Sequence, residues 1–352
     1  MPLKLVIRKA IPSMVVHCVD GEEIWASSYY TLYVSKDGGE TFSKVTDIKV
    51  QPMMKMLGNS RIISRAFRLG IRTLRKLKND AILVNANGKV LRLANERVEV
   101  VYSFEKGVGP LRDGWCEDEK GNIYIGEYFL NDTRKSAVKL LKSEDGGRSF
   151  QVIRSMKGVR HIHCVQYDPY EKKIWMGTGD RDEECSIQFS EDEGESWVDI
   201  GSGNQMFRTM SLLFMEDYVY WGTDTPARQS YIYRYMRRKG SISQLVPLNG
   251  PVYYSAVLEN GVKFFSTGAE GNSEGKSAAW DTRAHIWASL DGIKWEDIIS
   301  WEKDLWPHIL GYGRVLFAHG QYSKDSVFFT TQCLKNVDNI SFCADVRNES
   351  GS

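Results

Sequence analysis

The sequence predicts an all-β protein, a seven-bladed β-propeller of four-stranded antiparallel blades. Two repeating patterns support this prediction. One is an eight-residue turn that occurs three times, and the other is a short run of β-branched and aromatic residues that occurs seven times. A chain of 352 residues, 42% of them hydrophobic, can bury the core of such a repeat as one body. We therefore expect a single propeller domain over residues 1–352.

The repeated turn has the pattern Ser-x-Asp-x-Gly-x-Ser/Thr-aromatic. Its Asp carboxylate can accept hydrogen bonds from backbone N–H groups two or more residues further on, and its Gly supplies a positive φ. Each copy is therefore expected to form a hairpin tip on the outer rim, and the spacing fits a unit of about 50 residues. The full copies are Ser35-Lys-Asp-Gly-Gly-Glu-Thr-Phe42, Ser143-Glu-Asp-Gly-Gly-Arg-Ser-Phe150 and Ser190-Glu-Asp-Glu-Gly-Glu-Ser-Trp197, and a shortened copy is Ser289-Leu-Asp-Gly-Ile-Lys-Trp295.

The second pattern predicts one strand in each blade. Most of these runs follow a turn signal such as Asp20-Gly or Asn260-Gly, and we interpret them as the second strands of seven sheets. The runs are 24–27, 82–85, 123–126, 174–177, 219–222, 262–266 and 327–330. The blades then cover residues 13–48, 60–104, 109–156, 160–201, 207–247, 251–300 and 309–346.

The last blade shows only three clear strands, at 313–319, 326–334 and 339–345. A fourth strand is available at the other end of the chain, in residues 3–9. Pairing this N-terminal strand with the last blade would close the ring and leave no long open edge.

A basic stretch at residues 59–78 does not fit the β-repeat. Its arginines occur at helical spacing between apolar residues, which predicts a short amphipathic helix at 60–69 that runs into a strand. We expect these arginines to face solvent, and the alternative is contact of residues 60–78 with a polyanion or an anionic lipid surface. The arginines are Arg61, Arg65, Arg68, Arg72 and Arg75.

The repeated turn resembles the Asp box, or bacterial neuraminidase repeat, of sialidases and related β-propellers. In that class the motif is structural and lies on the rim, so the resemblance implies the fold and a sialidase-like, carbohydrate-active class of protein. Sialidases also carry an N-terminal Arg-Ile-Pro element, three carboxylate-binding arginines, an Asp acid/base and a Tyr nucleophile paired with a Glu. The nearest N-terminal match here is Arg8-Lys-Ala-Ile-Pro12, in which three residues separate Arg from Pro.

Candidate site residues follow from propeller topology. The start of each first strand and the loop between the second and third strands open on one face of the central channel, where propeller enzymes bind ligands. The catalytic candidates at these points are His161, His163, Asp180, Asp224 and Glu127. The substrate-binding candidates are Arg112, Asp113, Tyr128, Arg160, Arg181, Arg208, Arg228, Tyr254, Glu270, Tyr312 and Arg314.

The most informative segment is Arg160-His161-Ile-His163, followed by Asp180 after the next strand. On a strand, His161 and His163 point to the same face, and if that face is the channel they meet Asp180. Three interpretations stay open: catalysis or direct ligand contact, a structural role in a narrow polar channel, and a divalent metal held by two His and an Asp. Our assignment names catalysis, with no metal and no cofactor.

The residue types at the mouth suit an anionic sugar. Aromatic faces stack on sugar rings, and Arg forks bind carboxylate or sulfate. Opposed carboxylates can share acid and base roles in hydrolysis, whereas a His or Tyr beside an Arg-neutralised uronate can take the C5 proton, as in a lyase. We expect cleavage of an anionic or uronate-containing glycan, by a glycoside hydrolase or a polysaccharide lyase. The alternative is a non-catalytic propeller that binds a glycan or a protein, or scaffolds an assembly.

Composition excludes other classes. The 46 basic and 45 acidic residues give a net charge of +1, which does not favour a nucleic-acid partner. The six cysteines form no Cys-x-x-Cys pair, which argues against zinc. The N-terminus lacks a signal-peptide pattern, and no apolar run reaches the roughly 18 residues of a membrane span. We therefore expect a cytoplasmic protein, although a secreted protein trimmed of its signal peptide would look the same.

Overall fold

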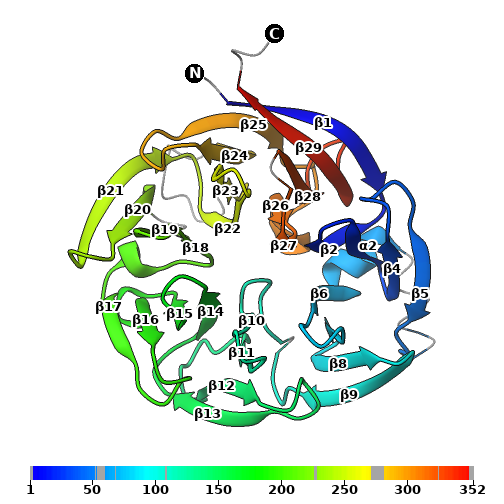
Figure 1. The fold of residues 1–352 in the computed structure, drawn as a ribbon, viewed down its shortest axis with the longest axis horizontal. Coiled ribbons are helices and arrows are strands. Elements are labelled where there is room, and N and C mark those ends of the chain that lie inside the picture. The colour runs from blue at the N-terminus through cyan, green and yellow to red at the C-terminus, as the bar shows by residue number, and fades with distance from the viewer. Residues whose placement is uncertain are drawn as a thin grey trace. The chain divides into compact units, whose positions relative to one another are not determined.

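The strands form seven separate sheets. The computed structural model describes residues 3–51, 53, 60–67, 69–107, 109–225, 228–270, 281–323 and 325–348. Within these residues the fold is a seven-bladed β-propeller of four-stranded, mostly antiparallel sheets (Figure 1). The predicted fold class is therefore confirmed. Each run that we interpreted as a second strand lies within, or overlaps, the second strand of its sheet.

The chain forms two compact units. The first comprises Met1–Ile71, Thr225–Tyr231 and Leu245–Ser352, and the second comprises Arg72–Asp224 and Ile232–Gln244. The single domain expected from the sequence stays a prediction.

The first unit contains three complete sheets. One consists of β2 (Val15–Asp20), β3 (Glu23–Ser28), β4 (Thr31–Ser35) and β5 (Ser43–Asp47), with the short β27 (His319–Gln321) added parallel to β2. The next consists of β22 (Val252–Val257), β23 (Lys263–Thr267), β24 (Arg283–Ser289) and β25 (Glu296–Glu302). The third consists of β26 (Arg314–Phe317), β28 (Ser326–Gln332), β29 (Ile340–Asn348) and β1 (Leu3–Pro12).

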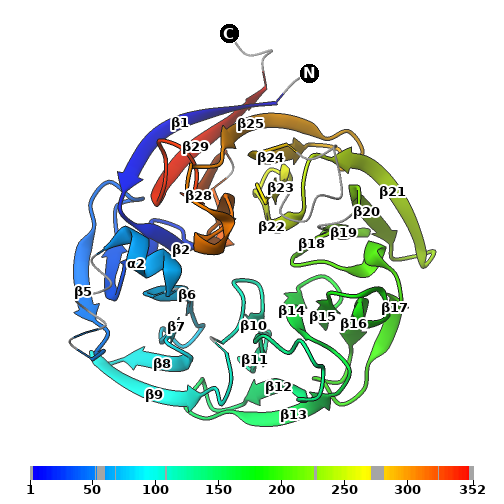
Figure 2. The ribbon, with the colours of Figure 1, turned by 180° about the vertical axis from the view of Figure 1, so that it is seen from behind.

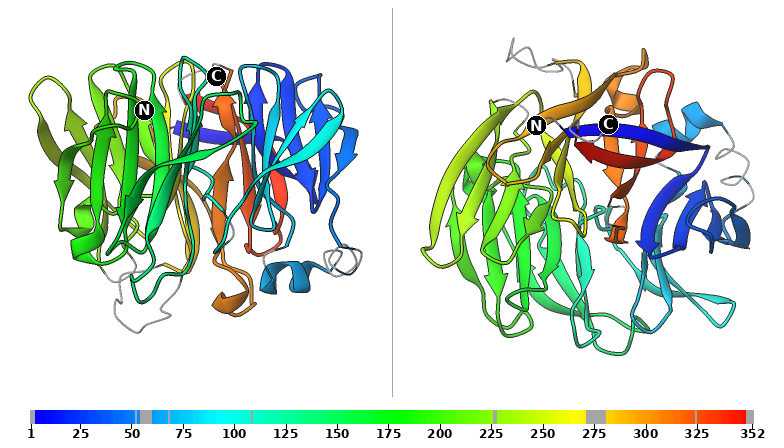
Figure 3. Two further views of the ribbon diagram at one scale, coloured as in Figure 1. Left: turned by 90° about the horizontal axis from the view of Figure 1, so that it is seen from below. Right: turned by 45° about the horizontal axis from the view of Figure 1, so that its top comes forward.

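The N-terminal strand completes the last blade, as predicted. β1 pairs antiparallel with β29, with one irregularity between Ile7 and Lys9. Figures 2 and 3 show the blue β1 beside the red β29 from several directions. Because β29 also pairs with β28, its backbone has a partner strand on both sides, which removes an open edge.

The second unit contains the sheets that carry the candidate site. One consists of β10 (Trp115–Glu117), β11 (Ile123–Gly126), β12 (Val138–Ser143) and β13 (Gln151–Met156), and the next of β14 (His161–Asp168), β15 (Lys173–Gly179), β16 (Ser186–Ser190) and β17 (Val198–Ser202). A further sheet, which belongs to this unit apart from Ile71, consists of β6 (Ile71–Lys76), β7 (Ile82–Ala86), β8 (Lys89–Ala94) and β9 (Arg97–Ser103). The remaining sheet consists of β18 (Leu212–Phe214), β19 (Tyr218–Gly222), β20 (Ser230–Met236) and β21 (Ser241–Leu248), of which Ser230–Tyr231 and Leu245–Leu248 are assigned to the first unit. Short 3-10 turns are η1 (Asp182–Glu184), η2 (Gln205–Phe207) and, in the first unit, η3 (His308–Leu310).

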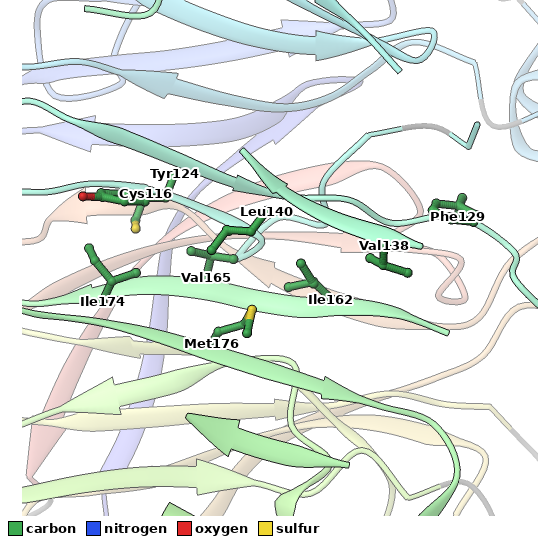
Figure 4. Packing of buried hydrophobic residues seen from close by; sticks show 9 residues of the cluster. All are labelled: Cys116, Tyr124, Phe129, Val138, Leu140, Ile162, Val165, Ile174 and Met176. Atoms are coloured by element: carbon green, nitrogen blue, oxygen red, sulfur yellow. The ribbon is translucent and has the colours of Figure 1, made fainter. Parts of the chain in front are cut away.

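An apolar layer between two blades fixes β14 in place. Side chains from both sheets interdigitate there, and nearly all are fully buried (Figure 4). Gly126 allows the close approach, since a Cβ at this position would lie 2.5 Å from Cγ2 of Ile162. The cluster is Cys116, Tyr124, Phe129, Val138, Leu140, Ile162, Val165, Ile174 and Met176. This packing places the start of β14, and therefore its two histidines.

The basic stretch forms the helix α2 (Arg61–Ala66), followed by β6, as the spacing predicted. Ser60 caps the helix by accepting a hydrogen bond from the Ile63 N–H. The expectation that the arginines face solvent is wrong for two of them. Arg61 forms a fork on Asp338 at 2.7 and 2.6 Å, and Arg65 is buried against Asp304 at 2.5 Å. Both guanidinium groups bind carboxylates within the first unit, and the buried charge of Arg65 requires such a partner.

Two predictions for this stretch are not tested by the structure. Arg68 lies outside the described residues, and contact of residues 60–78 with an anionic surface stays a prediction. In the part of the chain that the structure describes, no helix is long and apolar enough to cross a membrane.

Candidate functional site

Two histidines of β14 meet one aspartate from the loop that follows β15. The Nε2 atoms of His161 and His163 lie 2.9 Å apart. Oδ1 of Asp180 lies 3.4 Å from the first and 3.3 Å from the second. Both imidazoles are buried, and the Asp180 side chain is 13% exposed. Two imidazole nitrogens and one carboxylate oxygen therefore form a small triangle.

A β-bulge positions the histidines. Along β14, His161 and Ile162 pair with Gly179 and Thr178, but the next paired residue is Cys164, so His163 is the extra residue. The bulge lets both Ile162 and Val165 point into the apolar layer, three residues apart, while the two imidazoles face the other way. A bulge of this kind often re-aims a side chain near a functional site.

Guanidinium groups surround Asp180. Nη1 of Arg160 forms a very short contact with Oδ2, and Nη2 of Arg208 lies 3.0 Å from Oδ1. Arg208 also lies 3.3 Å from Asp224, and Arg160 lies 2.9 Å from Asp132. Burial acts to raise the pKa of Asp180, but the contacts with both histidines and the Arg208 charge hold it well below its usual range. Asp180 is thus an anion in the folded protein.

The fully buried carboxylate of Glu184 binds the backbone beside the histidine cluster. Glu184, in η1, binds Nε of Arg134 at 2.5 Å through Oε1. Its Oε2 accepts hydrogen bonds from the backbone N–H groups of Arg160, at 3.1 Å, and Asp180, at 3.2 Å. Because one carboxylate holds the backbone on both sides of the cluster, Glu184 fixes the separation of the strand start and the loop.

The environment also sets the state of the imidazoles. Burial lowers the pKa of His163 to about 4, although Asp180 opposes the shift, so this ring is neutral at neutral pH. Nδ1 of His161 lies 3.4 Å from the carbonyl oxygen of Phe129. That contact favours the tautomer with the proton on Nδ1, which leaves a lone pair on Nε2. The Tyr128 ring stacks on His161 with centroids 4.2 Å apart.

The remaining candidates of the second unit have other contacts. The carboxylate of Glu127 accepts a hydrogen bond from the backbone N–H of Lys139 at 2.9 Å, and burial raises its pKa. Arg112 and Asp113 are buried at the start of β10, where the Asp113 carbonyl accepts a hydrogen bond from Val165 and burial raises the pKa of the Asp113 carboxyl. The side chain of Arg181 is exposed.

The other five candidates belong to the first unit. Arg314 donates to Oε1 of Gln332 at 3.1 and 2.8 Å, and the hydroxyl of Tyr253 donates to Glu270. Tyr254 is buried, Tyr312 is 39% exposed and Arg228 is exposed. These residues stay predicted ligand contacts.

The sequence pattern missed several members of the network: Asp132, Arg134, Glu184 and the carbonyl of Phe129. Asp132 and Arg134 lie in the loop between β11 and β12, which also carries the candidates Glu127 and Tyr128, and Glu184 lies in the loop between β15 and β16, which also carries Asp180. Extending each candidate loop to the next strand would have included all of them.

No family model and no curated protein matches the chain. Solved structures do match. An oligogalacturonate lyase in complex with manganese has a TM-score of 0.62 at 11% identity, over 99% of this chain and 98% of that chain. An oligogalacturonate lyase from Vibrio parahaemolyticus gives 0.61 at 11% identity, over 98% and 97%. YCF48 bound to D1 peptide gives 0.57 at 12% identity, over 99% and 98%. At these identities the likeness shows the fold alone, and the sialidase-like assignment stays a prediction.

Proposed function

We propose that this protein binds and cleaves an anionic, uronate-containing glycan at the cluster of His161, His163 and Asp180. The observation that supports the proposal is one network in which two buried imidazoles share a carboxylate with two guanidinium groups. Two structures with the same fold are oligogalacturonate lyases, which makes uronates the first substrates to test.

The network suits elimination better than hydrolysis. Arg160, whose side chain is 26% exposed, can form a fork on a substrate carboxylate and so acidify the neighbouring C–H group. A neutral imidazole can accept that proton, and loss of the glycosidic oxygen from the next carbon leaves an unsaturated uronate. Hydrolysis requires a protonated carboxyl as the acid, whereas the pKa of Asp180 lies well below its usual range because His161, His163 and Arg208 outweigh its burial.

A second candidate function is non-catalytic binding. The carboxylate of Asp180 already has both histidines and both arginines as partners, and Arg160 also pairs with Asp132. A network that satisfies itself in this way is typical of a structural element. One structure of the same fold is bound to a peptide, which is consistent with a binding role.

Incubation with polygalacturonate and with sialylated glycans tests the proposal. We expect unsaturated product, followed by absorbance, from the uronate polymer, with a loss of roughly 100-fold or more in Arg160→Ala and His163→Ala. The control is His285→Ala, which removes a buried histidine of the first unit. New reducing ends without unsaturated product would indicate a hydrolase. Absence of turnover on every glycan would contradict the proposal, and binding that Arg160→Ala abolishes would then support the second candidate.

A further inference from the structure

The triangle formed by Nε2 of His161, Nε2 of His163 and Oδ1 of Asp180 has the dimensions of a metal site. First-row divalent ions bind His nitrogen and carboxylate oxygen at about 2.0–2.2 Å, so adjacent ligand atoms lie about 3 Å apart. The three atoms here are separated by 2.9, 3.3 and 3.4 Å. In the part of the chain that the structure describes, they form the single group of three such ligands that converge. We propose that His161, His163 and Asp180 bind a divalent transition-metal ion.

The donor set indicates which ions. Two imidazoles and one carboxylate suit manganese, iron, cobalt or zinc, whereas magnesium and calcium prefer oxygen ligands throughout. Three ligands on one side of an ion leave its other positions for water or a substrate oxygen. A carboxylate or hydroxyl of a sugar is the kind of group that such positions accept.

Neighbouring groups hold the three ligands in place, as the outer shell of a metal site does. The Nδ1 atom of a metal-binding His normally donates to a carbonyl or carboxylate, and Nδ1 of His161 faces the Phe129 carbonyl. Oδ2 of Asp180 is held by Arg160, while Oδ1 faces both histidines and also pairs with Arg208 at 3.0 Å. A Cβ on Gly179 would lie 3.0 Å from the His163 ring, so this ring is closely packed on that side as well.

Several carboxylates belong to the network around the three ligands. Its ion pairs join four carboxylates, of Asp132, Asp180, Glu184 and Asp224, to three guanidinium groups, of Arg134, Arg160 and Arg208. A bound cation would lower the repulsion among the two Nε2 atoms and Oδ1 of Asp180. Without the cation, only a proton shared among these three atoms can do so.

A second histidine offers a matched contrast. His285 also has two carboxylate neighbours, Asp281 at 3.2 Å from Nε2 and Asp297 at 2.7 Å from Nδ1. Because the two carboxylates contact opposite ring nitrogens, one ion cannot touch both of them and the ring. His285 is therefore an ordinary histidine–carboxylate arrangement, whereas the ligand atoms of His161, His163 and Asp180 converge on one point.

The inference shares its residues with the proposed function but does not rest on it. With an ion bound, the imidazoles are ligands, and the proton acceptor of an elimination has to be another group. Glycan cleavage by the imidazoles would survive a chelator, whereas cleavage that needs the ion would be lost with it. Ion binding is measured without glycan, so either proposal can fail while the other stands.

The test is calorimetric titration of chelator-treated, full-length protein with Mn²⁺ and Zn²⁺, with Mg²⁺ for comparison. We expect one Mn²⁺ or Zn²⁺ per chain and a higher unfolding temperature with the ion, and neither effect with Mg²⁺. Asp180→Asn, which keeps the side-chain shape, and His161→Gln should each weaken binding by more than the roughly 10–100-fold that is typical of outer-shell changes.

The control is Asp297→Asn beside His285, which should bind the ion as the unaltered protein does. Circular dichroism and thermal unfolding confirm that each variant is folded. The inference is wrong if neither Mn²⁺ nor Zn²⁺ binds at one per chain, or if Asp297→Asn weakens binding as much as Asp180→Asn. It is also wrong if both folded cluster variants keep the affinity of the unaltered protein.

Discussion

Two aspartates of the second unit are held in opposite ways. Asp145 lies in an exposed turn, and its partners are within four residues: Ser143 Oγ donates to it at 2.8 Å, and the N–H and hydroxyl of Ser149 donate at 3.0 and 2.6 Å. Asp180 lies in the histidine cluster, and its partners come from the start of β14 and from the residue after η2. The first arrangement is local, and the second depends on the tertiary fold.

Both arrangements lower the pKa of their aspartate, but for different reasons. Burial is the largest single influence at Asp145 and acts to raise the pKa, but the hydrogen bonds from Ser149 and Ser143 together bring it to about 2. Burial opposes the shift strongly at Asp180, where the histidines and Arg208 outweigh it. When one hydrogen-bond partner is removed from the exposed turn, water can take its place. Removal of one member of the cluster leaves buried charges unpaired, so the cluster should respond far more steeply.

The largest effect is expected for Glu184→Ala. The change removes a carboxylate that is 1% exposed and leaves the Arg134 guanidinium and two backbone N–H groups without their acceptor. Breaking a buried pair of this kind costs about 3–5 kcal/mol of the free energy of unfolding. Urea denaturation, followed by circular dichroism, measures it.

Glu184→Gln is the matched control for that change. Its amide oxygen can still accept from the N–H groups of Arg160 and Asp180, while the charge that pairs with Arg134 is lost. The Gln variant should therefore recover part of the stability. Equal stability of the Ala variant and the unaltered protein would mean that Glu184 does not organise the cluster.

The contrast also explains what the sequence could predict. The turn at Asp145 is readable because its hydrogen bonds join residues within one eight-residue motif, and the seven strand runs are readable because their pattern is local. The meeting of His161, His163 and Asp180 followed from blade topology. The role of Glu184 was not predictable, since it depends on how two loops approach each other. Glu127 was assigned to catalysis from its position, but its carboxylate accepts from the Lys139 backbone.

An intermediate effect is expected for Gly194→Ala in the third copy of the turn. Gly194 has φ +99°, and a Cβ there would lie 2.6 Å from Cδ1 of Ile153. Backbone strain of about 1 kcal/mol and the steric clash together should cost about 2–3 kcal/mol. Gly158→Ala is the control, because its φ is +78° but nothing lies within 4 Å of the added Cβ. If the two variants lose the same stability in urea, the rim turn is not packed against β13 of the neighbouring blade.

The smallest effect is expected for Asp145→Asn, and it should depend on pH. The pKa of Asp145 is about 2 in the folded protein, against about 3.9 in an unfolded chain. The folded state is therefore stabilised by the carboxylate above about pH 4, and this contribution disappears as the pH falls from about 4 through about 2. The group is exposed and screened by solvent, so the contribution should stay below about 1 kcal/mol. Asn keeps an oxygen acceptor but cannot ionise, so its deficit should be present at about pH 5 and vanish near pH 2. Urea denaturation across that range decides it: a deficit that does not change with pH would show that the shape of the turn, rather than the charge of its aspartate, holds the hairpin tip.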